Sequence, residues 1–262
     1  MKKLIVIVAI IALGACSSVP ITGRKQMMLV SDAEVLSMSL SSYQEYMKTA
    51  KISTNTTQTA MVKNVGSKIA AAVENYLRTN GLSADIKNFK WEFNLVQDKV
   101  PNAFCMPGGK VVVNEGILPI TATETGLAVV VGHEIAHAVA KHGNERMSQQ
   151  LAAQLGGKLL SVALQTKSAQ TQTIWSSVYG LGAQVGVILP YSRTHEYEAD
   201  KLGMIFMAMA GYDVNECVSF WQRMKTLSGG KSSPEFLSTH PSDDNRIAEM
   251  KKNIPEALKY KK

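Results

Sequence analysis

The sequence has no basic stripe with interleaved aromatic residues, no internal repeat and no low-complexity tract. Its formal net charge of +7 is spread along the chain, apart from a short lysine-rich end over residues 259–262. Such a spread indicates a solvated surface with at most weak attraction to anionic head groups, and it predicts no nucleic-acid partner. Hydrophobic residues make up 45% of the chain, which is ordinary for a globular protein with a buried core.

The N-terminal apolar run over residues 4–11 is short. A bilayer span takes about 20 apolar residues, so this run predicts a secretory signal peptide rather than a membrane-spanning anchor. Small residues follow it and end in Cys16, in a pattern that resembles a bacterial lipobox. We therefore predict a signal peptide over residues 1–15, lipidation of Cys16 and a lipid-anchored lead over residues 16–30. Ser17 resembles the sorting residue of outer-membrane lipoproteins, so the predicted location is the bacterial cell envelope, at the outer membrane facing the periplasm.

Cysteine is scarce, with three in the whole chain. Once Cys16 is assigned to the lipid, Cys105 and Cys217 remain. An oxidising envelope would permit a disulfide bond between them, but free cysteines are often buried as well. Because the sequence does not give the separation of their Cα atoms, both alternatives stay open.

Hydrophobic periodicity and turn residues predict a single domain over residues 31–262, mostly helical with a small β-sheet. The predicted helices cover residues 32–50, 58–79, 121–142, 145–166, 169–188, 192–210, 214–227 and 242–252, and the predicted strands cover residues 89–96 and 110–113. The segment over residues 145–190 is rich in small residues, which would also suit a mobile flap over a cleft.

The most informative motif is His133-Glu134-Ile135-Ala136-His137, an H-E-x-x-H pattern within an apolar run that predicts a buried helix. Residues i and i+4 of a helix lie on one face, with Cβ atoms roughly 5–6 Å apart. The two histidines can therefore bind one Zn²⁺, with Glu134 beside them. The alternative is a helix that merely carries two histidines. Because burying two imidazoles and a carboxylate is costly unless something compensates, and a metal does so, the zinc site is favoured.

A hydrolytic zinc site usually has three protein ligands and an open position for water. The third ligand is expected from residues 191–203, where Glu196 and Asp200 are four positions apart on one predicted helix face. If Glu196 binds the metal, Asp200 can accept a hydrogen bond from a ligand imidazole and fix its orientation. His195 and Glu198 are competing ligand candidates, and a fully solvated charged face is a further alternative for this segment.

These motifs resemble the CAAX-prenyl-endopeptidase and HtpX-like family of zinc metallopeptidases, closest to its small bacterial lipoprotein and periplasmic members of the LoiP and BepA types, without a tetratricopeptide-repeat tail. The matching stretches are Asn102-Ala103-Phe104, residues 108–113 with Gly116, residues 133–137, Ser192-Arg193, residues 196–200, Gly203, Thr239-His240-Pro241 and Arg246. The resemblance implies an α+β, mostly helical fold: a gluzincin-like metallopeptidase domain with a small β-sheet beside the H-E-x-x-H helix. It also implies that His133, His137 and Glu196 bind one zinc ion. Glu134 would then be the catalytic base, and Asp200 would orient a ligand imidazole.

The resemblance assigns further roles. His240 could donate a hydrogen bond to the oxygen that becomes charged during peptide hydrolysis, or cover the zinc in a self-inhibited state, or simply pack in a turn. Arg246 could orient the site or hold a helix. An extended substrate could pair with an edge strand beside the metal helix. The alternative is an ordinary core strand, and the two interpretations are compatible if only one edge of the strand is free. The predicted substrate strand consists of Lys110, Val111, Val112 and Val113.

We therefore predict a zinc-dependent endopeptidase of the bacterial cell envelope, with unfolded or misfolded envelope or outer-membrane proteins as substrates and a role in their quality control. The lipid at Cys16 would connect it to the membrane. A periplasmic chaperone or assembly factor with latent protease activity is the alternative. Hydrolysis of a non-peptide bond would use the same ligands.

Overall fold

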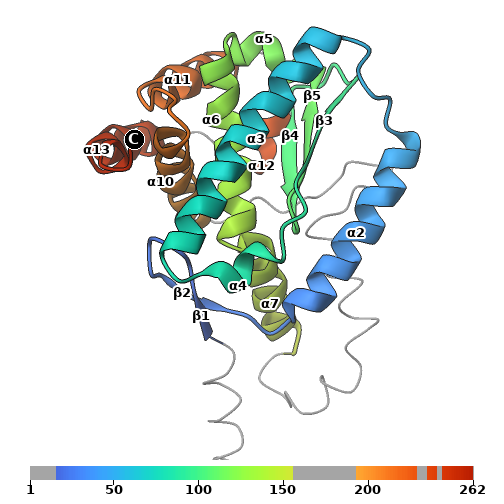
Figure 1. The fold of residues 1–262 in the computed structure, drawn as a ribbon, viewed down its shortest axis with the longest axis vertical. Helices are drawn as coiled ribbons and strands as arrows, with labels where there is room; N and C mark the ends of the chain where they lie inside the picture. The colour runs from blue at the N-terminus through green and yellow to red at the C-terminus, as the bar shows by residue number, and fades with distance from the viewer. Residues whose placement is uncertain (1–15, 156–192, 229–234, 241–243, 262) are drawn as a thin grey trace, which may run out of the picture.

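The computed structural model describes residues 16–155, 193–228, 235–240 and 244–261 (Figure 1). Their arrangement is α+β and mostly helical, as the sequence predicted. The predicted signal peptide, residues 1–15, and the predicted helix over residues 169–188 lie outside the described residues. Among the residues that are described, no helix combines the length and apolar character that a bilayer span requires.

The main sheet has three strands in the order β3 (Glu92–Val96), β5 (Lys110–Asn114) and β4 (Ala103–Met106). β5 runs parallel to β3 and antiparallel to β4, and a tight turn joins β4 to β5. Gly108 and Gly109 in that turn have φ angles of +87° and +85°, a left-handed conformation that glycine adopts without strain.

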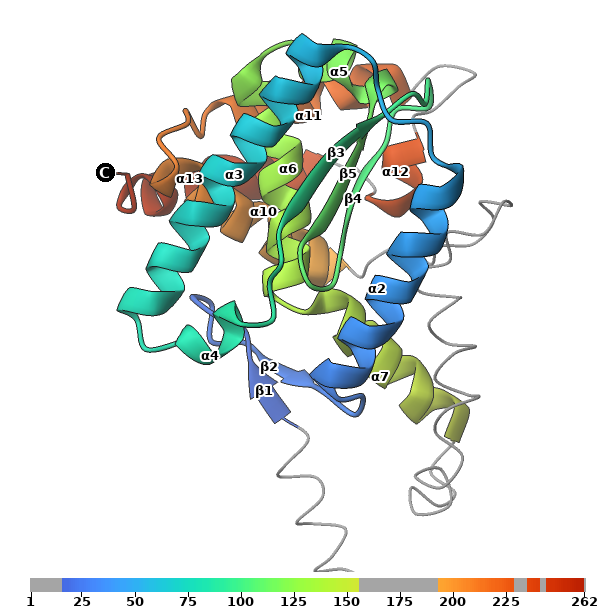
Figure 2. The same cartoon turned by 45° about the vertical axis from the view of Figure 1, so that its right-hand side comes forward.

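The central strand β5 is buried on both faces, and its alternating side chains divide the core in two. Val111 and Val113 belong to the larger hydrophobic cluster, which includes the apolar face of α3 (Thr56–Thr79). Val112 belongs to a smaller cluster with α2 (Asp32–Thr49). Figure 2 shows α3 and α2 on opposite sides of the sheet. Both helices were predicted from the sequence, within two residues at each end.

The position of β5 corrects one prediction. The interpretation of Lys110, Val111, Val112 and Val113 as a substrate-pairing edge is wrong, because β3 and β4 occupy both sides of this strand. Its backbone N–H and C=O groups are therefore used within the sheet. The outer strands of the sheet are β3 and β4, and β4 is the one that packs closely against the metal-motif helix α6 (Glu124–Val139).

Helix α6 runs through the middle of the molecule and is crossed by α10 (Arg193–Met209) (Figure 1). Glycines on both helices allow a close approach. A Cβ atom on Gly203 would lie 3.0 Å from the backbone nitrogen of His133, and a Cβ atom on Gly132 would lie 3.2 Å from the backbone oxygen of Gly203. Because both distances are tighter than ordinary contacts, a larger residue at Gly203 would push α10 away from the H-E-x-x-H motif.

Helix α6 ends at Val139, three residues before the predicted end. Lys141 then adopts a left-handed φ of +56°, and its ammonium group hydrogen-bonds to Asp32 and Asp85. The chain turns at this point, and His142 becomes the first residue of α7 (His142–Leu155). The prediction of one helix continuing to residue 142 is therefore wrong, and the predicted helix over residues 145–166 is described only to its residue 155.

Within the predicted lead over residues 16–30, the chain forms a small antiparallel hairpin of β1 (Cys16–Ser18) and β2 (Lys25–Met27), and this hairpin packs against α7. Val19, in the loop of this hairpin, is buried in the larger hydrophobic cluster. The remaining described elements are α4 (Ser83–Ile86), η1 (Glu115–Ile117), α5 (Leu118–Thr121), α11 (Glu216–Ser228), α12 (Glu235–Thr239) and α13 (Asp244–Leu258).

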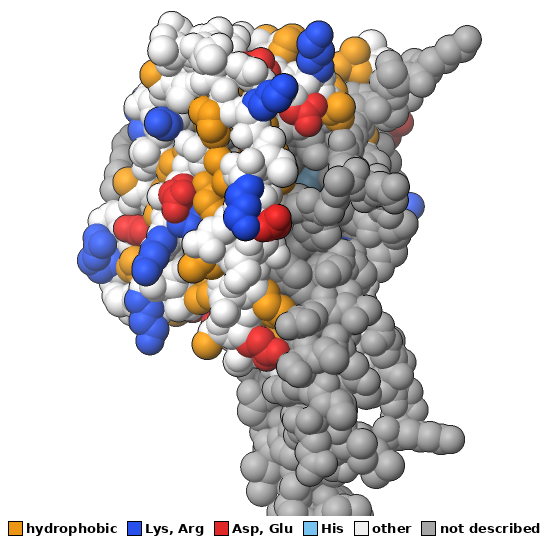
Figure 3. Space-filling view, turned by 90° about the vertical axis from the view of Figure 1, so that its right-hand side faces the viewer, with side chains coloured by type: hydrophobic (Ala, Val, Ile, Leu, Met, Phe, Trp, Pro, Cys, Tyr) orange, Lys and Arg blue, Asp and Glu red, His pale blue; other side chains and the backbone are white. Residues whose placement is uncertain are grey.

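The surface charge of the described residues is mixed in sign. On the face drawn in Figure 3, basic and acidic side chains are interspersed, with hydrophobic side chains between them. This pattern agrees with the spread of charge along the sequence, where the excess of 28 Lys and Arg over 21 Asp and Glu is not gathered in blocks.

Candidate metal centre

Four side chains with metal-binding atoms converge in the interior of the described part of the chain: His133, His137, Glu196 and His240. The first two lie one turn apart on α6, Glu196 lies in the first turn of α10, and His240 follows α12. Each residue is at most 3% exposed. The four ligand atoms all lie within 4.8 Å of one another, so a single ion could contact all of them.

The distances between these atoms match the size of a small tetrahedral site. His133 Nε2 lies 3.0 Å from His137 Nε2 and 3.1 Å from His240 Nδ1. The carboxylate of Glu196 lies 3.0 Å from His240 Nδ1, 3.4 Å from the nearest imidazole nitrogen of His137 and 3.5 Å from that of His133. Ligand atoms about 2.0–2.1 Å from a tetrahedral Zn²⁺ would be separated by about 3.3 Å. The residues present therefore fit such an ion.

The contacts on the far side of each α6 imidazole indicate where the protons lie. His133 Nδ1 lies 2.9 Å from a carboxylate oxygen of Asp200, and His137 Nδ1 lies 2.9 Å from His142 Nδ1. A proton on Nδ1 of each metal-motif histidine makes both contacts hydrogen bonds and leaves the two Nε2 lone pairs facing each other. Two lone pairs 3.0 Å apart repel unless a cation lies between them, which supports a metal ion at this point.

Arg246 on α13 balances two of the carboxylates that α10 brings into the interior, those of Glu196 and Asp200. Its guanidinium lies 2.9 Å from Glu196, donates hydrogen bonds of 2.5 and 2.8 Å to Asp200, and is centred 3.7 Å from the ring of Trp221. Burial would raise the pKa of Asp200, but Arg246 outweighs it and lowers that pKa. Burial would also raise the pKa of Glu196, but electrostatic interactions with His240 and Arg246 hold it well below its usual range. Both groups thus stay ionised, as a ligand and an imidazole acceptor require.

Glu134 lies beside the ligand atoms with the properties of a general base. The residue is 3% exposed, and its Oε1 makes no hydrogen bond within the described residues, although it lies 3.2 Å from His240 Nε2. Burial raises the pKa of Glu134 to about 7 in the metal-free protein, against the opposing effects of His240 and a hydrogen bond from the backbone of Cys105. A carboxyl group with a pKa near neutrality can take up a proton and return it.

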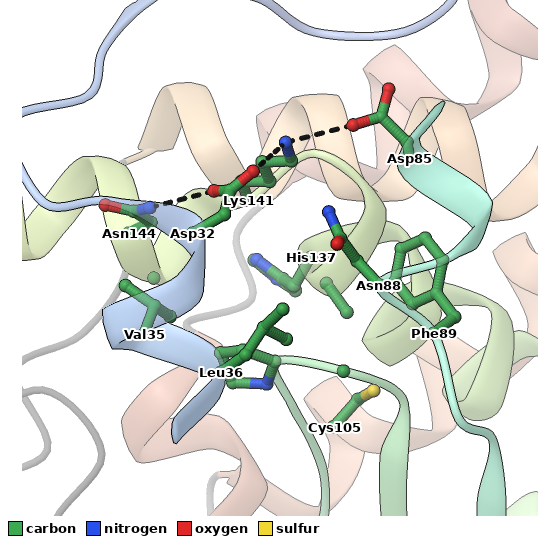
Figure 4. Close-up of a pocket in the computed structure, with 14 residues that line it drawn as sticks. Asp32, Val35, Leu36, Asp85, Asn88, Phe89, Cys105, His137, Lys141 and Asn144 are labelled. Carbon is green, nitrogen blue, oxygen red and sulfur yellow. Dashed lines mark hydrogen bonds and ion pairs between the residues drawn. The ribbon is translucent and has the colours of Figure 1, made fainter. Parts of the chain in front are cut away.

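A pocket opens beside this cluster, between α2, the end of α6 and the turn after β4 (Figure 4). His137 and Cys105 both line it, and Leu36 and Phe89 contribute apolar surface. Lys141, with its two carboxylate partners, lies at one side of the pocket in Figure 4. The pocket thus connects the outer strand β4 with one of the helix histidines.

A second cluster of buried polar side chains surrounds His142. The sequence did not connect this histidine with the metal site. His142 Nε2 lies 2.9 Å from Glu198, and His195 Nε2 lies 2.9 Å from Glu145. Arg24, from the N-terminal hairpin, hydrogen-bonds to both carboxylates. The alternative of a solvated charged face on α10 is therefore wrong, since His195, Glu196 and Glu198 are all buried. Of these three, Glu196 is the one in the ligand cluster.

The pKa values of this second cluster follow from the same contacts. Burial lowers the pKa of His142 to about 4, so its imidazole is neutral at neutral pH. Burial would raise the pKa of Glu145, but hydrogen bonds from His195 and Arg24 outweigh it and lower that pKa to about 2. Hydrogen bonds from His142, Thr22 and Arg24 do the same for Glu198, whose pKa is also about 2 despite its burial.

The two remaining cysteines are free and buried in this structure, so the disulfide alternative is not realised. Cys105 lies in β4 and Cys217 in α11. Burial raises the pKa of both thiols well above the usual value. Because the thiolate is the nucleophilic form, neither residue is suited to attack a substrate.

Comparison with known proteins identifies relatives of this arrangement. The model of Peptidase family M48 matches residues 67–254, which include the whole ligand cluster. The chain is 36% identical over 191 residues to the mitochondrial metalloendopeptidase OMA1 of Schizosaccharomyces pombe, covering 72% of this chain and 53% of that protein. It is 31% identical over 247 residues to the mitochondrial metalloendopeptidase OMA1 of Homo sapiens, covering 92% of this chain and 46% of that protein.

A bacterial protein also matches. The beta-barrel assembly-enhancing protease of Yersinia pestis is 34% identical over 165 residues, covering 62% of this chain and 34% of that protein. The chain thus spans about half the length of the mitochondrial relatives and less of the bacterial one. The matches agree with the metallopeptidase family that the motifs predicted. They include mitochondrial and bacterial proteins alike, so a position among small bacterial lipoproteins stays a prediction.

Proposed function

Because the chain belongs to peptidase family M48, we propose that it is a zinc-dependent endopeptidase of the bacterial cell envelope. The observation that carries this proposal is the convergence of three imidazoles and one carboxylate beside the carboxylate oxygen of Glu134 that lacks a hydrogen bond within the described residues. Metal-assisted hydrolysis needs an ion site and a base within reach of the same water molecule. Both requirements meet in this one buried cluster.

The proposed mechanism assigns a task to each residue. His133, His137 and Glu196 would hold the ion. Zinc, when bound, supplies a Lewis acid that polarises the scissile carbonyl and makes a water molecule more acidic. Glu134 takes the proton of the attacking water on its carboxylate and later donates it to the leaving amine. Asp200 keeps the imidazole of His133 in one orientation throughout.

The outer strand β4 supports the choice of an extended polypeptide as substrate. The backbone of Cys105 in this strand contacts the carboxylate of Glu134, so a peptide lying along β4 would pass close to the base. Pairing through the backbone uses groups that every peptide has, and it therefore selects extended segments rather than a particular sequence. We infer that the substrates are unfolded or misfolded envelope or outer-membrane proteins. The name of the Yersinia pestis relative, which refers to assembly of β-barrels, is consistent with this class.

The proposed location depends on the sequence pattern around Cys16 alone. A lipid on this cysteine would anchor the chain at the outer membrane, facing the periplasm. Mass spectrometry of the N-terminal peptide from cells tests this step, and an unmodified Cys16 would contradict it.

His240 offers a fourth possible ligand atom in the cluster, and a tetrahedral ion held by four protein atoms would have no position left for water. We infer that this arrangement is a latent form of the enzyme, from which His240 has to move before cleavage. The competing role is donation of a hydrogen bond to the developing oxyanion, which would require His240 near the ion but not bound to it.

The substitution Glu134→Gln tests the proposed mechanism. It removes the base but no metal ligand, so cleavage of a casein-like unfolded substrate should fall by about 10²–10⁴-fold while the zinc content of the purified protein stays unchanged. A chelator should abolish wild-type cleavage, and added zinc should restore it. The substitution Glu256→Gln, at an exposed position, is a matched control, and this variant should cleave the substrate at the wild-type rate. Normal cleavage by Glu134→Gln would show that the mechanism is wrong.

The same assay with His240→Ala separates the two roles of this histidine. Faster cleavage is expected, because the substitution opens a position for water. Slower cleavage with zinc retained would support the donor role and contradict the latent form.

A periplasmic chaperone or assembly factor with latent protease activity is the second candidate, and the closed set of four ligand atoms favours it. Cells that carry only Glu134→Gln distinguish the two functions. They should resemble a deletion strain if cleavage is the function, and a wild-type strain if chaperone binding is.

A further inference from the structure

A continuous series of short polar contacts links His137 to the N-terminal hairpin. Nδ1 of His137 lies 2.9 Å from Nδ1 of His142, and Nε2 of His142 lies 2.9 Å from a carboxylate oxygen of Glu198. Glu198 in turn accepts a 2.7 Å hydrogen bond from Nε of Arg24 and a further hydrogen bond from the hydroxyl of Thr22. Two groups, His142 and Glu198, therefore stand in series between a proposed metal ligand and Arg24, which lies 174 residues away from Glu198 in the sequence.

The left-handed turn at Lys141 makes this series possible. In an uninterrupted α-helix, a residue five positions after His137 would lie about 140° around the helix axis from it. The chain instead leaves α6 and starts α7 at His142, which brings the two imidazole centres to 4.9 Å. His142 is 0% exposed in this position, so its ring is enclosed by the protein.

The protons of the series can be assigned in one consistent way. An ionised Glu198 only accepts hydrogen bonds, so Nε2 of His142 must carry the proton that points at it. A neutral imidazole has a proton on one nitrogen only, which leaves Nδ1 of His142 as an acceptor. His137 must then donate from its own Nδ1, and its Nε2 is left without a proton where it faces the ligand cluster.

Arg24 holds the far end of the series in place. Besides its bond to Glu198, its two terminal nitrogens donate bonds of 2.9 and 2.6 Å to the two oxygens of Glu145. Glu145 also pairs with His195, whose ring stacks on that of His142 with the centroids 4.5 Å apart. Both carboxylates are at most 7% exposed, and without the guanidinium they would be two buried like charges with imidazoles as the nearest compensation.

We propose that His142, Glu198 and Arg24 are positioning residues for His137, which hold its Nε2 unprotonated and directed at the ion. Metal-ligand histidines commonly donate their second N–H to a carboxylate, a backbone carbonyl or water. Here an imidazole stands between the ligand and the carboxylate, and the N-terminal hairpin completes the arrangement. This inference rests on the proposed function only in assuming that an ion binds at the cluster.

Two substitutions of His142 separate positioning from packing. Leucine has a similar volume but can neither accept a hydrogen bond from His137 nor donate one to Glu198, whereas glutamine can do both through its amide. Zn²⁺ affinity of the full chain, measured at neutral pH by competition with a chromophoric chelator, should fall by about 10–100-fold in His142→Leu. His142→Gln should recover most of the loss. Wild-type affinity in His142→Leu, or an equal loss in both variants, overturns the proposal.

The protonation of His137 provides a readout that packing alone does not control. Nitrogen-15 NMR of the metal-free protein, labelled at histidine, should find His137 with its proton on Nδ1 and His142 with its proton on Nε2. In Glu198→Gln the amide can point either its oxygen or its N–H group at His142, so the two tautomers should mix. A wild-type His137 with its proton on Nε2 overturns the proposal, whatever the zinc affinities are.

The contribution of the hairpin is tested at Arg24. Arg24→Ala should weaken zinc binding less than His142→Leu, and Arg24→Lys should restore part of the affinity. Arg223→Ala is a matched control, because Arg223 also bonds a carboxylate and two backbone oxygens from a partly buried position but touches no member of the series. It should bind zinc like the wild type. If Arg24→Ala and Arg223→Ala bound zinc with equal affinity, the N-terminal hairpin would have no part in positioning His137.

The outcomes also distinguish this inference from the proposed function. A wild-type protein that binds no zinc refutes the metallopeptidase proposal, while the tautomer of His137 still decides the positioning of its ring. If His142→Leu does not fold, Arg24→Ala and the NMR measurement decide instead.

Discussion

His133 and His137 have the same side chain, lie one turn apart on α6 and face the same cluster, yet the fold orients them in different ways. His133 contacts its carboxylate, Asp200, directly. On the side of its ring away from the ligand cluster, His137 reaches a carboxylate, Glu198, only through a second imidazole. The first arrangement is contained within the core formed by α6, α10 and α13, whereas the second extends to the N-terminal hairpin.

The two arginines at the ends of these arrangements show the difference most clearly. Arg246 binds Glu196 and Asp200 and its side chain is 1% exposed, whereas Arg24 binds Glu145 and Glu198 and its side chain is 24% exposed. Each arginine balances two carboxylates. Solvent partly screens the charge of Arg24 but not that of Arg246, so we expect the ion pairs of Arg246 to contribute more to folding stability. The comparison indicates that contacts within the core orient His133, whereas contacts that extend to the N-terminal hairpin orient His137.

Arg246→Ala should have the largest effect of the substitutions that test this difference. It leaves Glu196 and Asp200 as buried charges without their main partner and removes the contact with Trp221. Breaking a buried ion pair in this way should lower the free energy of unfolding by about 3–5 kcal/mol. Urea denaturation of the metal-free protein at neutral pH measures this change in the free energy of unfolding.

Arg223→Ala serves as the control for Arg246→Ala, because its ion pair with Glu216 is more exposed. Arg223→Ala should lower the free energy of unfolding by no more than about 1 kcal/mol. If Arg246→Ala were no less stable than this control, the ion pairs of Arg246 would not contribute more to folding stability than those of Arg24.

The sequence predicted the part of this site that a single helix controls. His133 and His137 are brought together by a four-residue spacing on α6, and the same spacing brings Glu196 and Asp200 to one face of α10. Such spacings fix relative positions without knowledge of the rest of the fold. The close approach of α6 and α10 needed in addition a small residue at their crossing, and Gly203 was among the residues that carried the family resemblance.

The remaining parts depend on contacts between distant segments, and no local pattern reveals them. Arg24 pairs with residues 121 and 174 positions away, and its own segment is predicted from the sequence only as a lipid-anchored lead. The sequence places His142 at the end of α6, because residues 138–141 contain no glycine or proline and the break in the helix coincides with the positive φ of Lys141. Strand β4 was missed because prolines and glycines flank its four residues. Without β4, nothing in the sequence shows that both edges of β5 are occupied.

Arg24→Ala should have a smaller effect and a characteristic dependence on pH. At neutral pH it should lower the free energy of unfolding of the metal-free protein by about 1–2 kcal/mol, because the hydrogen bonds that it removes come from a guanidinium that is 24% exposed and thus partly screened by solvent. Glu145 and Glu198 have pKa values of about 2 in the folded protein, against an ordinary value of 4.5. A carboxylate with a lower pKa in the folded state stabilises the fold above its unfolded pKa.

This stabilisation is lost as the pH falls from about 4.5 towards about 2, because the carboxylates of the folded wild-type protein then take up protons. The difference in stability between the wild type and Arg24→Ala should therefore shrink across that range. Urea denaturation at a series of pH values measures it, and Arg24→Met, which retains most of the side-chain volume, should follow Arg24→Ala. If the difference in unfolding free energy between the wild type and Arg24→Ala stayed constant with pH, Arg24 would act by packing rather than by its charge. The contrast between Arg24 and Arg246 would then not be explained by exposure to solvent alone.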